Sequence, residues 1–179
     1  MKVDYSKNIG VVSLLLLVMS LAGCGTPPKT AGEFRNMAKD GGMFLSSETF
    51  VVKRPYQQVV DSYKQRALPC LNQTIDSSWW EGGVPRIKHT EIRAWKAKVN
   101  ATNKHMECSL QSRVTGGNTV ELGDPPKDGF YYMVIDAYPV DQNTTRVVLG
   151  KAINVSDNVA QAAKNWATGE SMGCPDMTQ

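Results

Sequence analysis

The first 24 residues contain a mostly apolar segment that decides in which compartment the rest of the chain folds. Residues 9–19 form this segment, Lys2 and Lys7 precede it, and small and apolar residues lead from it to Cys24. A helix that crosses a bilayer stably needs roughly 20 consecutive apolar residues, so the segment is too short to span but suits the hydrophobic part of a secretory signal peptide. The sequence therefore predicts that residues 1–23 are a leader removed on export.

The end of this leader predicts a lipid modification. Leu21-Ala22-Gly23-Cys24 resembles the lipobox of bacterial lipoproteins. The resemblance implies that Cys24 receives a diacylglyceryl thioether and becomes the mature N-terminus, with the membrane and the lipoprotein processing and sorting machinery as partners. Gly25, where an aspartate would retain the protein in the inner membrane of enterobacteria-like species, implies the periplasmic face of the outer membrane. The alternative is an ordinary secretory signal followed by a chance cysteine.

The mature chain left by this processing has 156 residues, which suits one domain with a tether. It carries 18 basic and 16 acidic residues with the two signs interspersed. Long-range electrostatics should therefore contribute little to the choice of partner, and the lack of a run of lysines and arginines argues against a nucleic-acid partner.

The cysteines predict one disulfide bond. Lipidation of Cys24 leaves Cys70, Cys108 and Cys174 in a compartment where disulfides persist. The alternation of residues 105–114 turns Cys108 into the core, as in a half-buried strand. Cys70 lies at an expected helix end and Cys174 in a loop near the C-terminus, where a bridge disturbs no strand pairing. We therefore predict the pair Cys70–Cys174; the alternative is three free thiols.

The segment after the lipidation site, residues 24–46, is expected to be a tether that contains one short helix. Thr30 and Glu33 match a capping box, and apolar residues follow them at helical spacing. Such a short helix is marginal alone, so its apolar face must dock on the domain, on a partner or on the membrane surface.

Residues 47–179 are expected to form a single periplasmic domain. A strand from Ser47 leads to a helix that Pro69 stops, and further strands follow, with Val120 and Leu122 as a possible short strand inside a long loop. A last amphipathic helix is capped by Ser156 and ended by Gly169. The expected fold class is α+β: an antiparallel curved sheet of about five or six strands, with one helix in the N-terminal half and one at the C-terminus.

This order of elements resembles a small helix-grip domain over residues 47–169. That superfamily includes the START-like lipid carriers and the globular domains of one lipoprotein subunit of the outer-membrane barrel-assembly machine. The resemblance implies a sheet that curls around the C-terminal helix, and it transfers no catalytic residue.

The sequence contains no recognisable catalytic or metal-binding set. It lacks a nucleophile with an adjacent base and a spaced set of metal ligands, so we expect neither an enzyme nor a metal or cofactor. Asp136 is the one polar residue in an otherwise apolar strand, and we expect it to face outward or to be hydrogen-bonded. Four aromatic residues could either line a ligand cavity or fill the core: Trp95, Tyr132, Tyr138 and Trp166.

Trp79 and Trp80 are the strongest candidates for a contact with a partner. They adjoin a glycine break, so at least one indole should be exposed. Together with the anchor, this favours a non-catalytic interaction or scaffold component of a cell-envelope assembly, with other envelope proteins as partners. The alternative is a periplasmic binding or carrier module for a lipid or another apolar ligand.

Overall fold

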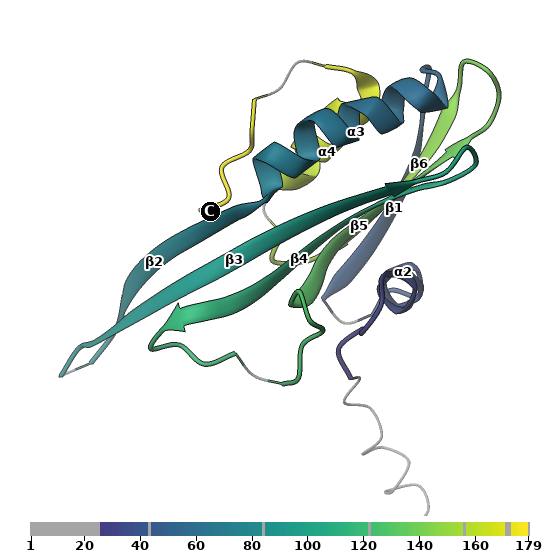
Figure 1. The fold of residues 1–179 in the computed structure, drawn as a ribbon. Coiled ribbons are helices and arrows are strands. Elements are labelled where there is room, and N and C mark those ends of the chain that lie inside the picture. Colours follow the sequence, from purple (N-terminus) through teal and green to yellow (C-terminus); the bar gives the residue numbers. More distant parts are fainter. Residues whose placement is uncertain are drawn as a thin grey trace, which may run out of the picture.

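The computed structural model describes six antiparallel strands in one sheet and three helices (Figure 1). The described residues are 26–42, 44–83, 85–121, 123–155, 157–170 and 173–178, so the predicted leader and lipidation site lie outside them. None of the described helices is both long and apolar enough to cross a membrane. The elements in chain order are α2 (Ala31–Lys39), β1 (Leu45–Val52), α3 (Tyr56–Leu71), β2 (Gln73–Glu81), β3 (Ile87–Ala101), β4 (Met106–Gly117), β5 (Phe130–Pro139), β6 (Thr145–Ala152) and α4 (Asp157–Thr168).

The predicted α+β class is confirmed. The strand order is β1-β6-β5-β4-β3-β2, so β1 pairs with β6, the last strand in the chain. β1 and β2 are the two edge strands of an open sheet. Helices α3 and α4 lie on one face, which we call the inner face, and α2 lies on the other, the outer face (Figure 1). This arrangement is consistent with the helix-grip shape.

The inner face holds the main core. The stripe of α3 that helical periodicity predicts, from Tyr56 to Ala67, is buried. Trp166 of α4 is buried beside it and meets Tyr63 edge to face, with ring centroids 6.1 Å apart. The Tyr63 hydroxyl donates a hydrogen bond to the carbonyl of Ala163 at 2.7 Å, which satisfies its one buried polar group. The last helix is therefore fixed to α3 as well as to the sheet.

The short helix α2 docks on the outer face of its own sheet. Thr30 is its N-cap and accepts a hydrogen bond from the Glu33 amide at 3.1 Å. Phe34 and Ala38 are buried against Val134 of β5. Gly150 of β6 permits this close approach, because a Cβ there would lie 3.3 Å from the Ala38 Cβ. Much of the segment predicted as tether is therefore packed against the sheet.

Two local predictions are wrong. Helix α3 does not stop at Pro69 but continues to Leu71, since a proline in the last turn removes only one backbone hydrogen bond while Cys70 and Leu71 are buried. The described residues between Gly117 and Phe130 contain no strand, and Val120 is exposed, while Leu122 lies outside the described residues. Asn118 explains the path of the loop. Its side-chain oxygen accepts a hydrogen bond from the Thr90 backbone amide at 2.6 Å, and the chain turns away from the sheet at this point.

Cys70 and Cys174 form a disulfide, the pair that the sequence predicts, across a separation of 104 residues. Cys108 is free and buried on the inner face. Burial raises the pKa of the Cys108 thiol to about 12, so it stays protonated and unreactive at neutral pH.

Asp128 ties the long loop to β3 and gives a prediction for low pH. Lys96 donates to its carboxylate at 2.6 Å and Lys98 also pairs with it, and these hydrogen bonds lower its pKa from 3.8 to about 2. A carboxyl group whose pKa falls on folding stabilises the native state above its unfolded pKa, and this contribution disappears as the pH drops through the folded pKa.

We therefore expect the wild-type free energy of unfolding to decrease more between pH 4 and pH 2 than that of Asp128→Asn. Urea titrations at a series of pH values measure this difference. Parallel pH profiles for the two proteins would contradict the role of Asp128.

Candidate functional site

The two tryptophans lie near the tip of a ribbon formed by β2 and β3, which projects beyond the helix-covered part of the sheet (Figure 1). Trp79 is 44% exposed and Trp80 is 62% exposed. Their cross-strand partners are His89 and Lys88. Neighbouring strand residues point to opposite faces, so the ribbon carries one exposed indole on each face. Ile87 adds a third exposed apolar side chain.

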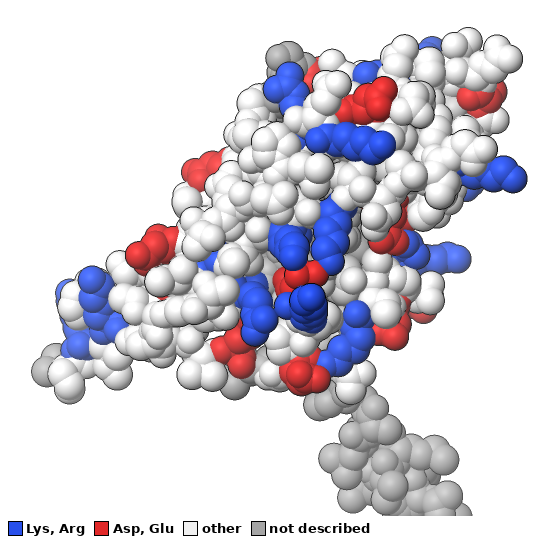
Figure 2. All heavy atoms as spheres, in the orientation of Figure 1, with Lys and Arg blue, Asp and Glu red and all other residues white. Residues whose placement is uncertain are grey.

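A stacking contact and a polar contact, both made by His89, hold part of this tip in place. The Trp79 ring stacks on His89 with centroids 5.4 Å apart, and His89 Nε2 lies 2.8 Å from a carboxylate oxygen of Glu81. Arg86 and Lys88 are exposed. Figure 2 shows basic side chains together at the left end of the view, where Figure 1 places the tip. We call residues 79–83 and 85–89 the hairpin tip.

Strand β2 is an edge of the sheet. It pairs with β3 and with no other described strand, and its residues from Asp76 to Glu81 are exposed. The backbone groups on its outer side therefore remain available for pairing, in the same segment that carries the two indoles.

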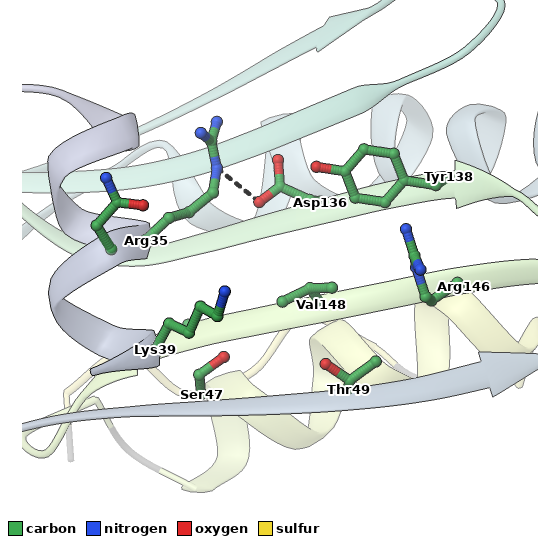
Figure 3. A pocket seen from close by; sticks show the side chains of 10 residues that line it. Arg35, Lys39, Ser47, Thr49, Asp136, Tyr138, Arg146 and Val148 are labelled. Atoms are coloured by element: carbon green, nitrogen blue, oxygen red, sulfur yellow. Dashed lines mark ion pairs between the residues drawn. The ribbon is translucent and has the colours of Figure 1, made fainter. Parts of the chain in front are cut away.

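A buried ionic cluster lies under α2. Asp136 of β5 is 1% exposed, and its Oδ1 lies 2.6 Å from His105 Nε2. Its Oδ2 forms an ion pair with Arg35 Nε at 2.7 Å, shown by the dashed line in Figure 3. Arg35 belongs to α2 and also pairs with Glu107 of β4. The cluster therefore links the docked helix to two central strands.

A cavity of about 330 Å³ opens next to this cluster, between α2 and the outer face of β5, β6 and β1 (Figure 3). Three basic side chains, one carboxylate and three hydroxyl groups line it. Arg146 lies over the Tyr138 ring, with its guanidinium carbon 5.1 Å from the ring centroid. The lining residues are Arg35, Asn36, Lys39, Ser47, Thr49, Asp136, Tyr138, Arg146, Val148 and Gly150.

The structure separates the four aromatic residues considered for a ligand cavity. Trp166 fills the core, and Trp95 packs edge to face against Tyr132 with centroids 4.9 Å apart. Tyr138 lines the cavity on the opposite, outer face. A register shift between Leu110 and its neighbour explains this, because it leaves Tyr132 without a β4 partner and lets it turn inward. These four side chains therefore do not line one common cavity.

Sequence reasoning identified Asp136 as unusual but missed Arg35, Lys39 and the cavity they line. A signal was present in the strand pattern, since His105 and Glu107 share the parity opposite to Cys108 and therefore point to the outer face. Nothing local indicated that α2 would lie over them. Within the described part of the chain, no three metal-ligating side chains come together.

Comparisons with known proteins give only distant structural neighbours. No protein-family model matches the chain, and no curated protein matches it. One solved structure, the di-domain ARO/CYC BexL of the BE-7585A biosynthetic pathway, is 14% identical with a TM-score of 0.31; the match covers 72% of this chain and 46% of that one. Another, a putative uncharacterized protein from Bacillus thuringiensis, is 16% identical with a TM-score of 0.24, covering 70% and 88% of the two chains.

Proposed function

We propose that this chain is a lipoprotein anchored through Cys24 to the periplasmic face of the outer membrane, and that its domain is a non-catalytic interaction component of a cell-envelope assembly. The lipobox at residues 21–24 supports the anchor. The hairpin tip supports the proposed interaction most strongly, because it exposes two tryptophans to solvent at a free edge of the sheet.

The partner that fits this tip best is an envelope protein with an extended segment. Trp79 and Trp80 point to opposite faces of the ribbon, so a flat surface on one side would reach only one of them. A partner strand that continues the sheet beyond β2 would instead pair with its free backbone groups and place side chains next to both indoles. Tryptophan is among the residues that contribute most to binding when an interface covers it.

Together with the predicted anchor, the docking of α2 supports a position of the domain near the membrane. Ala31, the first residue of α2, lies seven positions after Cys24 in the sequence. A fully extended chain covers at most roughly 3.5 Å per residue, so the tether reaches roughly 25 Å. The domain is then held close to the lipid surface, and its partner must be accessible there.

We expect a photo-crosslinking residue at position 80, introduced in cells, to form an adduct with one envelope protein. The matched control is position 153, because Ile153 is also exposed but lies outside the tip. The double substitution Trp79→Ser/Trp80→Ser should abolish co-purification of that protein while the domain still unfolds cooperatively in urea, since neither side chain belongs to the core.

Adducts with lipid alone would show that the tip contacts the bilayer and would contradict a protein partner. Equal adducts from both positions, or co-purification that survives the double substitution, would also contradict the proposal.

A further inference from the structure

We propose that the cavity between α2 and the sheet binds a phosphate group, either of a soluble phosphate ester or of a phospholipid headgroup. The cavity lies on the outer face, far along the sheet from the hairpin tip, and the proposed interaction does not involve it (Figures 1 and 3).

The first observation is uncompensated positive charge. Arg35 pairs with two carboxylates, those of Asp136 and Glu107, so this group contributes no positive charge to the cavity. Lys39 and Arg146, which also line the cavity, form no ion pair with any described carboxylate. Lys39 and Arg146 outnumber the one excess carboxylate of that group, and the positive charge that remains favours an anion in the cavity.

The second observation is the arrangement of donors. Figure 3 shows Lys39, Arg146 and the hydroxyl-bearing Ser47 and Thr49 placed around Val148, and they come from α2, β6 and β1. An ammonium group, a guanidinium fork and hydroxyl groups approaching from different sides match the several oxygens of a tetrahedral phosphate.

The third observation is the room left beside these donors. A cavity of about 330 Å³ is larger than one phosphate group, and Val148 and the ring of Tyr138 give it apolar surface. Arg146 is held over that ring, which orients its guanidinium group. The space beside the phosphate therefore suits a small organic part such as a glycerol unit.

The site also depends on the docked state of α2, because Arg35 and Lys39 both belong to that helix. A ligand that contacts α2 and the sheet together binds only the docked state. By linkage it must stabilise the docking of α2.

The test uses the full chain purified from membranes in a non-ionic detergent. Calorimetry with inorganic phosphate and with glycerol 3-phosphate tests the soluble source, and phosphatidylglycerol in mixed micelles, with phosphatidylcholine as reference, tests the headgroup. The variant Lys39→Gln/Arg146→Gln is compared with Arg66→Gln/Lys127→Gln, which removes the same charge from exposed positions outside the cavity and outside the hairpin tip.

We expect at least tenfold weaker binding in the first variant and less than twofold change in the control. Binding of the two soluble phosphates assigns the site to a phosphate ester, and binding of phosphatidylglycerol alone assigns it to a headgroup. Equal losses in both variants would show non-specific attraction to charge. That result, or no binding of any of these probes at millimolar concentration, would overturn the proposal.

Discussion

Replacing Phe34 with alanine is expected to detach α2 from the sheet while the rest of the domain stays folded. The Phe34 ring is fully buried between the helix and β5, next to Tyr131 with centroids 6.2 Å apart. Truncating a buried phenylalanine typically costs about 3 to 5 kcal/mol. A nine-residue helix has little stability of its own, so losing this contact removes most of what holds it in place.

Hydrogen exchange followed by mass spectrometry measures this effect directly. In Phe34→Ala, the backbone amides of α2 should exchange at least a hundredfold faster, and those of α3 and α4 at nearly the wild-type rate. Met37→Ala is the matched control, because Met37 lies on the same helix and is only half-buried. Unchanged protection of α2 in Phe34→Ala would show that Phe34 does not hold the helix.

Removing the disulfide is expected to destabilise the whole domain by about 4 kcal/mol. Cys70 at the end of α3 and Cys174 in the C-terminal segment enclose a loop of about a hundred residues, and in the chain-entropy model the stabilisation grows with loop length. The described part of that segment also buries Met177 against the core, and the bridge holds it there.

Urea unfolding of Cys70→Ala/Cys174→Ala in non-reducing buffer gives this value. We expect the midpoint to fall and the slope to rise, because the unfolded chain without the bridge is less compact and exposes more surface. Adding a reductant should lower the wild-type midpoint to about that of the double variant and should not shift the variant itself. A wild-type midpoint that is insensitive to the reductant would contradict a stabilising bridge.

Much of the fold was predictable from the sequence because most helices and strands have a recognisable local pattern of apolar residues. The stripe from Tyr56 to Ala67 has a helical period, and the strand around Cys108 alternates. Each pattern required a buried face, and each has one in the structure. The end of α3 was missed because a proline rule that holds in mid-helix is weaker in the last turn, where the burial of Leu71 outweighs it.

The sites were less predictable because they depend on contacts between distant segments. One glycine break was enough to predict that at least one of Trp79 and Trp80 is exposed, and both are. The partners of Asp136 could not be identified, because Arg35 is about a hundred residues away and reaches it only through the docking of α2. The same docking brings Lys39 opposite Arg146 and so creates the cavity.

Helix α2 connects the two proposals in this way. It follows the predicted anchor by seven residues, and it carries two of the basic side chains that line the cavity. With the proposed anchor and the proposed phosphate site, a ligand in the cavity would stabilise the docking of α2 and so keep the domain close to the membrane.

Mass spectrometry of the N-terminal tryptic peptide of the protein purified from membranes tests the lipid anchor directly. We predict a peptide of residues 24–29 that begins at Cys24 and carries the mass of a diacylglyceryl thioether and an N-linked acyl chain. In the fully processed form this gives three acyl chains, each methylene of which contributes about 0.8 kcal/mol when buried in the bilayer. A mature N-terminus at another residue, or an unmodified Cys24, would contradict the lipid anchor on which the proposed function depends.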